Sequence, residues 1–232
     1  MKFVKWEDLP KRMRNESVRP YYECLMRRQK SMKVKRLIDV ICSSILLVLL
    51  SPAMIILAIG IKLDSKGPVF FRQARITQYG REYRIFKFRT MVAGADKKGP
   101  AVTTSGDSRI TRMGLLLRKC RLDELPQLFN VLAGDMSFVG TRPEVKKYVE
   151  AYTDEMWATL LLPAGITSRT SIAYKDEDKI MEKYLKEGSS VDEVYIKHIL
   201  PDKMKYNLEY LKKFSALGEI KIMIDTVFAV LR

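Results

Sequence analysis

One uninterrupted hydrophobic run dominates the pattern of apolar and polar positions along the chain. Residues 40–61 are 22 positions without a charged side chain. A straight helix of that length rises about 33 Å, enough to cross the hydrocarbon core of a bilayer. The run begins too far along the chain for an ordinary cleavable signal peptide, and no small-residue cleavage pattern follows it. The pattern therefore predicts a membrane-embedded helix.

Two features of this run favour a helix that enters the membrane and returns to the same side. Ser51-Pro52 lies at its middle, where proline favours a kink and leaves the Val48 carbonyl to the Ser51 hydroxyl. Basic residues flank both ends of the run: Lys33, Lys35, Arg36, Lys62, Lys66, Arg72 and Arg75. Because Lys and Arg mark cytoplasmic flanks, both ends are expected in the cytoplasm. A kinked helix that spans the bilayer is the alternative, since membrane helices tolerate proline.

Three regions follow from this run: a basic N-terminal segment at 1–32, a re-entrant membrane helix at 33–64, and a cytoplasmic catalytic domain at 65–232. Residues 1–36 hold 12 basic and 4 acidic side chains, a net charge of +8. The N-terminal segment is therefore interpreted as lying on anionic lipid headgroups. A solvated basic tail is an equal alternative.

The domain at 65–232 begins with two short strands, 69–71 and 83–88, around a turn at 78–80. A loop follows at 96–106, and Asp107-Ser108 is expected to cap a helix at 109–119. Asp123 is the candidate N-cap of the next helix. Residues 202–231 end the chain in amphipathic helix, whose apolar stripe is interpreted as packing against protein and lipid jointly. The elements predict an α+β, mostly helical fold with a small β-hairpin.

Composition narrows the function classes. The chain has 232 residues, a net charge of +15 and 47% hydrophobic residues, which excludes a disordered chain. Three scattered cysteines and a single histidine, His198, exclude a disulfide framework and a familiar zinc site. A Ser-His-Asp triad is excluded unless His198 serves it. The positive charge indicates an anionic partner: nucleic acid, an acidic membrane face or a phosphorylated substrate.

A strongly basic stretch ends directly at two adjacent carboxylates. Between Arg72 and Arg121 there are 13 basic and 3 acidic residues, and Asp123 and Glu124 follow. Mg²⁺ takes oxygen ligands, usually one or two carboxylates plus substrate phosphates, so this arrangement suggests a magnesium ion holding a polyphosphate. An ionised aspartate beside such a phosphate can act as a nucleophile. The alternative is a plain helix cap with a solvated glutamate.

Six motifs in order resemble the bacterial sugar transferase family of monotopic phosphoglycosyl transferases. They are Lys35–Asp39, Ser51-Pro52, Gly67–Gln73, Phe86–Met91, Arg121–Asn130 and Gly134–Pro143. The resemblance covers residues 33–232 and the compact form of the family. It implies a monotopic membrane protein with a re-entrant helix kinked at Ser51-Pro52 and with interfacial amphipathic helices. The expected location is the cytoplasmic face of the bacterial inner membrane.

The resemblance also implies an activity. The enzyme would transfer sugar 1-phosphate from a UDP-sugar to undecaprenyl phosphate and release UMP. Asp123 would form a covalent phosphosugar intermediate, and Glu124 would help Asp123 to place Mg²⁺. This would be the first membrane step of exopolysaccharide, capsule, O-antigen or glycoprotein glycan synthesis. The sequence does not identify the transferred sugar, and a homodimer is compatible with the sequence.

Phosphate-binding residues are nominated because arginine suits bidentate phosphate recognition. The candidates are Lys87, Arg89, Arg112, Arg118 and Arg142, together with Pro143 of the Thr141-Arg142-Pro143 motif, which the resemblance places near the nucleotide. A solvated helix face is the alternative for Arg112 and Arg118. Lys35 and Arg36 are expected at lipid headgroups, and contact with the acceptor phosphate is the alternative.

One loop departs from the family pattern, which often reads Pro-Gly-(Ile or Leu)-Thr-Gly. This chain has Ala164 in place of the proline and Ser168 in place of the second glycine, so no role is carried over there. Two rival functions remain. A membrane-anchored basic binding protein without catalysis would not need Asp123. A soluble nucleic-acid binder leaves the apolar run unexplained, so no nucleic acid is expected.

Overall fold

The computed structural model describes residues 3–95, 107–174, 177–185 and 190–231, so the loop expected at 96–106 lies outside the described residues. The fold is mostly helical, in agreement with the prediction. The α-helices are α1 Arg19–Met26, α2 Gln29–Asp64, α3 Arg112–Lys119, α4 Gln127–Ala133, α5 Lys146–Glu150, α6 Arg169–Ala173, α7 Glu177–Leu185, α8 Val191–Val194, α9 Leu200–Lys212 and α10 Ala216–Leu231. Shorter turns are η1 Trp6–Asp8, η2 Lys11–Met13, η3 Gln78–Gly80, η5 Leu122–Glu124, η6 Met156–Leu161 and the π-helical η7 Tyr195–Ile199.

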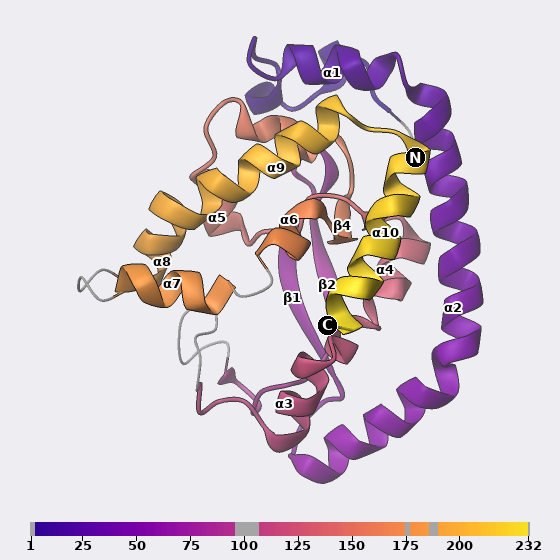
Figure 1. The fold of residues 1–232 in the computed structure, drawn as a ribbon, viewed down its shortest axis with the longest axis vertical. Coiled ribbons are helices and arrows are strands. Elements are labelled where there is room, and N and C mark those ends of the chain that lie inside the picture. Colours follow the sequence, from indigo (N-terminus) through magenta and orange to yellow (C-terminus); the bar gives the residue numbers. More distant parts are fainter. Residues whose placement is uncertain (1–2, 96–106, 175–176, 186–189, 232) are drawn as a thin grey trace.

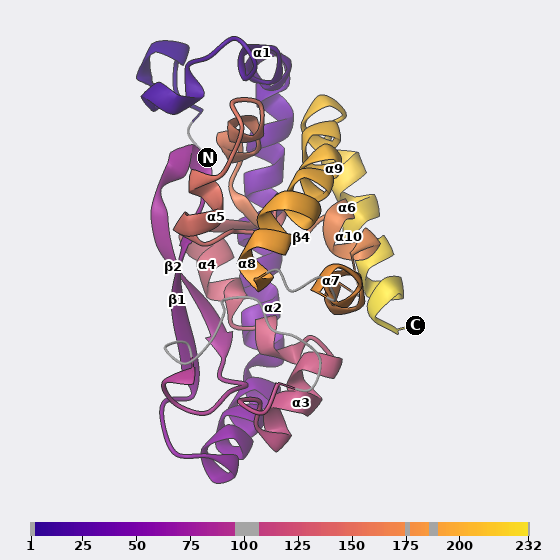
Figure 2. The same cartoon turned by 90° about the vertical axis from the view of Figure 1, so that its left-hand side faces the viewer.

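Two small sheets organise the interior. Strands β1 (Phe70–Ile76) and β2 (Glu82–Phe88) form the predicted antiparallel hairpin, joined by η3. Strands β3 (Met136–Val139) and β4 (Ala164–Thr167) pair in parallel. Figure 2 shows the hairpin on one side of the molecule and α9 and α10 on the opposite side. Helix α4 packs against both β2 and α2, which brings the hairpin next to the long helix.

Helix α2 runs along one edge of the molecule (Figure 1) and is continuous through Pro52. The Ser51 hydroxyl donates to the Val48 carbonyl at 2.8 Å, as expected for the acceptor that a proline leaves without its donor. A kink at Ser51-Pro52 stays a prediction. The helix is the only one in the described part of the chain that is long and apolar enough to cross a membrane.

The first half of α2 is attached to the domain by buried polar contacts. Lys35 is 1% exposed, and its Nζ donates to Glu219 Oε1 and to the Val139 carbonyl, both at 2.7 Å. Arg36 donates to two carbonyls at the C-terminal end of α4. The expectation that Lys35 and Arg36 meet lipid headgroups is therefore wrong. Their charges are used inside the protein, because a buried carboxylate and the last carbonyls of a helix need donors.

The N-terminal segment is packed rather than a solvated tail. Leu9, Met13, Val18 and Leu25 are buried in the main core together with residues of η6 and α9. The Tyr21 hydroxyl donates to Glu155 Oε1 at 2.5 Å. The basic side chains stay on the outside, so contact with headgroups stays a prediction.

Two predicted helix starts are wrong. Helix α3 begins at Arg112, because Thr111 Oγ1 accepts from Gly114 N at 3.0 Å and acts as the N-cap. Asp107 instead pairs with Arg109. Asp123 caps no helix: Arg121 adopts a left-handed conformation (φ 54°), so the chain turns into the short η5 before α4 begins.

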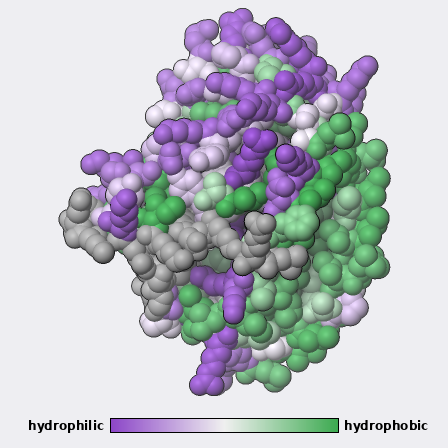
Figure 3. Space-filling model, viewed as in Figure 1, coloured by the Kyte–Doolittle hydropathy of each residue, from purple (hydrophilic) through white to green (hydrophobic). Residues whose placement is uncertain are grey.

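The apolar surface is concentrated on one side of the molecule. Only 11% of the most hydrophobic window of α2 is buried. Figure 3 shows a continuous hydrophobic area on the side of α2 and α10, opposite a hydrophilic area. In α10, Ile220, Ile224 and Val227 are exposed, whereas Ile222 packs into the main core. The arrangement is compatible with a monotopic membrane protein.

Candidate active site

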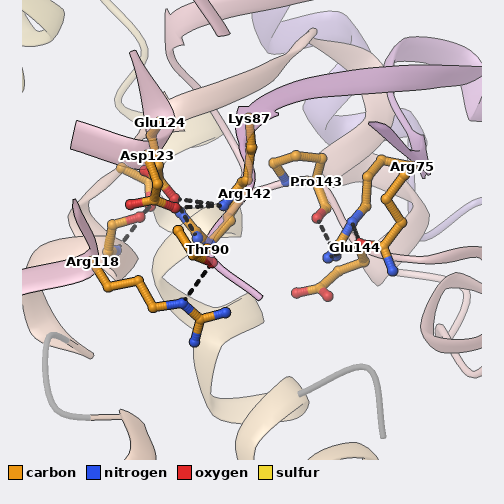
Figure 4. Close-up of polar contacts among 12 residues, drawn as sticks. Arg75, Lys87, Thr90, Arg118, Asp123, Glu124, Arg142, Pro143 and Glu144 are labelled. Atoms are coloured by element: carbon orange, nitrogen blue, oxygen red, sulfur yellow. Dashed lines mark hydrogen bonds and ion pairs between the residues drawn. The ribbon is translucent and has the colours of Figure 1, made fainter. Parts of the chain in front are cut away.

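The dyad Asp123-Glu124 lies in η5, between α3 and α4, and both residues are only 9% exposed. Lys87 of β2 donates to Glu124 Oε1 at 2.9 Å and lies 3.8 Å from Asp123 Oδ2. Arg142 Nη2 donates to the same Glu124 oxygen at 2.7 Å. Figure 4 shows these four side chains converging from three separate segments. Glu124 thus accepts hydrogen bonds from both Lys87 and Arg142, whereas Asp123 has the longer ion-pair contact with Lys87.

The two carboxylates differ in their electrostatics. Burial raises the pKa of Asp123, an effect that Lys87 opposes and the neighbouring Glu124 reinforces. Burial also acts to raise the pKa of Glu124, but Arg142 and Lys87 outweigh it and hold that pKa well below its ordinary value. Glu124 is therefore firmly ionised, and Asp123 is the less stabilised anion of the pair. A carboxylate whose pKa is shifted by burial beside a specific charge partner on a cavity wall is a candidate functional group.

A third cation borders the dyad. Arg118 Nε donates to the Thr90 hydroxyl at 3.0 Å. The two terminal nitrogens of Arg118 donate no hydrogen bond to a described residue. Arg118 lines the same cavity as the dyad. Because two parallel donors match a phosphate, this side chain is arranged for an anionic ligand.

The dyad opens into a cavity of about 900 Å³. Its walls include Asp123, Glu124, Lys87, Arg118 and Arg142. A cavity of this size accommodates a ligand as large as a nucleotide sugar. The cavity continues past Arg142 to Pro143 and Glu144 and then to residues of α6 and α9.

Four of the nominated phosphate-binding residues meet around the dyad, namely Lys87, Arg118, Arg142 and Pro143. Arg112 does not: it is exposed at the first turn of α3 and is not among the cavity residues. Arg89 borders the cavity, but its terminal nitrogens donate to the carbonyls of Ile61, Ser65 and Lys66. The last carbonyls of α2 lack helical partners, so the terminal nitrogens of Arg89 attach that end of the helix, and phosphate contact by Arg89 stays a prediction.

Four further residues line the cavity and were not predicted as site residues, namely Arg75, Glu144, Tyr195 and Lys203. Arg75 Nη1 donates to the Pro143 carbonyl at 3.1 Å. A signal for Arg75 existed, because alternation in the hairpin places it on the same face as Lys87. Glu144 directly follows the Thr141-Arg142-Pro143 motif.

The dyad also fits the donor chemistry of a Mg²⁺ site. Two adjacent carboxylates supply oxygen ligands, and Mg²⁺ commonly completes its shell with water and substrate phosphates. Among the described residues no group of three or more His, Cys, Asp or Glu side chains is placed to hold a metal. Asp123 and Glu124 would therefore hold the ion together with a bound polyphosphate.

Comparison with known proteins gives a consistent result. The model of the family described as bacterial sugar transferase matches residues 30–232. The UDP-N-acetylgalactosamine-undecaprenyl-phosphate N-acetylgalactosaminephosphotransferase of Aeromonas hydrophila is 34% identical over 85% of this chain and 44% of its own length. The UDP-glucose:undecaprenyl-phosphate glucose-1-phosphate transferases of Klebsiella pneumoniae and Caulobacter vibrioides are 36% and 34% identical, over 85% and 83% of this chain and 40% and 68% of their own lengths. The chain thus spans less than half the length of the first relatives it matches. With its ordered motifs and buried dyad, the chain belongs to the bacterial sugar transferase family.

Proposed function

We propose that the protein transfers sugar 1-phosphate from a UDP-sugar to undecaprenyl phosphate, with release of UMP. The observation that carries the proposal is a buried aspartate, Asp123, in a basic cavity on a molecule with a large apolar face. The curated relatives supply the substrate class through their names, which pair a UDP-sugar with undecaprenyl phosphate. A carboxylate nucleophile and phosphate-binding cations suit that reaction.

The proposed reaction has two displacements at one phosphorus. A carboxylate oxygen of Asp123 attacks the sugar-linked phosphorus, and the bond from that phosphorus to the bridging oxygen breaks, so UMP departs with the electron pair. A phosphate oxygen of the lipid then attacks the same phosphorus, and the bond to Asp123 breaks. Undecaprenyl-diphosphate-sugar is formed and the carboxylate is regenerated. Two steps allow a soluble donor and a lipid acceptor to use the cavity in turn.

The surrounding residues have separate tasks in this scheme. Lys87 and Arg142 neutralise Glu124, which keeps a second negative charge from repelling the phosphates. Arg118 and Arg142 line the cavity beside the dyad and would contact phosphate oxygens of the donor there. Mg²⁺, when held by the dyad and the diphosphate, would supply charge neutralisation for the departing UMP.

The attachment of α2 supports a re-entrant helix. Lys35, Arg36 and Asp39 fix its first half to the domain, and Arg89 fixes its end to the same domain. When both ends of a helix are held by one domain, both ends lie on the side of the bilayer where that domain lies. We therefore propose that the protein lies on the cytoplasmic face of the inner membrane, because basic residues on both flanks of the apolar run favour the cytoplasmic side.

Single cysteines at Lys33 and Ser65 test this topology. Both flank the apolar run and are at least partly accessible. In a background without the native cysteines, an impermeant maleimide is expected to label both positions only from the cytoplasmic side, because both flanks stay on that side. Labelling of the two positions from opposite sides would establish a spanning helix.

The proposed reaction is tested by incubating the protein in lipid vesicles with undecaprenyl phosphate, Mg²⁺ and a panel of UDP-sugars. UMP release and a lipid-linked sugar are expected with at least one donor, because the cavity accepts a nucleotide sugar and the apolar face reaches the acceptor. A basic binding protein without catalysis would bind vesicles and release no UMP from any donor, and that result would remove the proposal.

The pH dependence of the reaction is set by the ionisation of Asp123. The nucleophile must be deprotonated, and Lys87 lowers its pKa against the raising effect of burial. In Lys87→Met that opposition is lost, so the pKa of Asp123 rises further and the acidic limb of the kcat/KM profile moves to higher pH. Lys66→Met, which removes an exposed lysine on the same domain, serves as control. An acidic limb that stays in place or moves to lower pH in Lys87→Met would show that another group limits the rate.

A further inference from the structure

The cavity holds a second polar cluster, which the transfer steps above do not use. Glu144, Tyr195 and Lys203 line it and are all buried. The Tyr195 hydroxyl donates to Glu144 Oε1 at 2.5 Å, and Lys203 Nζ donates to the Tyr195 hydroxyl at 3.0 Å. Lys203 Nζ also lies 3.7 Å from Glu144 Oε1. A buried ion pair is a weak source of stability, so its place on a cavity wall indicates a ligand role.

One carboxylate oxygen of this cluster is available to a ligand. Glu144 Oε1 takes the contacts from Tyr195 and Lys203, whereas Oε2 accepts no hydrogen bond from a described residue. Figure 4 shows the Glu144 carboxylate directed into the space between Arg75 and the group around Asp123. A carboxylate held in this way accepts hydrogen bonds from hydroxyl groups.

The local backbone gives an independent indication. Tyr195 opens η7, the π-helical turn between α8 and α9. Such wide turns inside helices are rare and are frequently found at functional sites. Lys203 follows on α9, on the same side of the cavity. The two donors of the cluster thus come from one helical segment and the acceptor from the segment after β3.

The segment that carries Arg142 and Glu144 links the dyad to the cluster, since Arg142 contacts Glu124 and Glu144 contacts Tyr195. Glu144 is two residues further along the chain than Arg142, so the Cα atoms of Arg142 and Glu144 are no more than about 7 Å apart. Ile76 N donates to the Glu144 carbonyl at 3.0 Å, and Arg75 binds the Pro143 carbonyl, so strand β1 holds this spacing. A UDP-sugar carries a hydroxylated ring directly beyond each phosphate, the sugar on one side and the ribose on the other.

We infer that Glu144, Tyr195 and Lys203 form a subsite that binds two neighbouring hydroxyl groups of the ring next to the diphosphate. The inference rests on the proposed function, because it takes a UDP-sugar as the ligand. The neighbouring hydroxyls come from either the ribose or the transferred sugar, which present the same chemistry. Glu144 accepts from the hydroxyls, and Lys203 and Tyr195 orient the carboxylate.

Deoxygenated ligands identify the ring. Equilibrium dissociation constants of the full chain in detergent micelles are measured for UDP-glucose, its 2′-deoxyribose analogue and its 3-deoxyglucose analogue. Loss of a hydroxyl bonded to a carboxylate is expected to weaken binding by about 10- to 100-fold. A penalty for the first analogue assigns the subsite to the ribose, and a penalty for the second assigns it to the sugar.

The decisive comparison repeats these measurements in Glu144→Gln and, as a second variant, in Tyr195→Phe. The penalty is expected to fall below about 3-fold in Glu144→Gln, because the hydroxyl has lost its charged partner. Glu209→Gln, which removes an exposed carboxylate on α9, is expected to keep the full penalty. The inference is overturned if neither analogue binds more weakly to the unaltered protein. It is also overturned if both variants weaken all three ligands equally, as a purely structural cluster would.

Failure of this inference is distinct from failure of the proposed function. UMP release with penalties that do not depend on Glu144 would remove the subsite and leave the transfer reaction in place. A Glu144-dependent penalty without UMP release from any donor would keep the subsite and remove the transfer reaction.

Discussion

Asp123→Asn is expected to lower the rate of UMP release by on the order of 10⁴-fold or more. The amide has nearly the same shape as the carboxylate but lacks the anionic oxygen that forms the bond to phosphorus. Lys87, Arg118 and the Glu124–Arg142 pair all stay in place, so the donor should still bind. The expected signature is thus a loss in kcat with a nearly unchanged dissociation constant for the UDP-sugar.

Asp135→Asn is the matched control for this substitution. Asp135 pairs with the exposed Arg81, and Asp135 is not among the residues that line the cavity. We expect its activity to stay within about 2-fold of the unaltered protein, because an exposed ion pair contributes little free energy. If Asp123→Asn kept a substantial part of its activity while Asp135→Asn behaved normally, Asp123 would not be the nucleophile.

The second large effect is expected from Lys35→Met, which leaves Glu219 buried without its cation. Lys35 is 1% exposed and donates to Glu219 at 2.7 Å. Removing one partner of a buried pair costs about 3–5 kcal/mol of unfolding free energy. This pair joins α2 to α10. The loss of unfolding free energy is therefore expected to lower the midpoint of denaturant unfolding, measured for both proteins in the same detergent.

The pH dependence of that loss has a definite sign. Burial raises the pKa of Glu219, and Lys35 opposes that rise. In Lys35→Met the folded protein prefers a protonated Glu219 still more strongly, so the lost stability is partly recovered as pH falls. The exposed pair Lys213–Glu209 provides the control, and Lys213→Met is expected to change stability by less than about 1 kcal/mol. Equal effects of the two lysine substitutions would contradict the structural role of Lys35.

The sequence predicted the elements that have strong periodic or turn signals. The hairpin followed from alternation around Gln78–Gly80, and the long apolar helix from its uncharged run. The first residues of helices were harder to predict from the sequence, because the N-cap depends on a backbone conformation that composition does not reveal. Thr111 caps α3 in place of Asp107, and the left-handed Arg121 separates Asp123 from α4.

The candidate site was predicted in its centre and missed at its edges. Asp123, Glu124, Lys87 and Arg142 are close in space, as the motifs suggested. The role of Arg89 at the end of α2 was missed, because its place in a basic stretch does not reveal that its terminal nitrogens donate to the Ser65 and Lys66 carbonyls. The Glu144 cluster depends on contacts between segments about 50 residues apart, which no local pattern encodes.

Locating the covalent phosphosugar intermediate on the unaltered protein tests whether Asp123 is the nucleophile. The protein is incubated with Mg²⁺ and a UDP-sugar labelled in its β-phosphate, without undecaprenyl phosphate, and is then quenched, digested and analysed by mass spectrometry. The account predicts label and the mass of a sugar phosphate on the peptide that contains Asp123, with one UMP released per labelled chain. Label on any other residue, or rapid lipid-linked product formation with no labelled protein at any time, would contradict it.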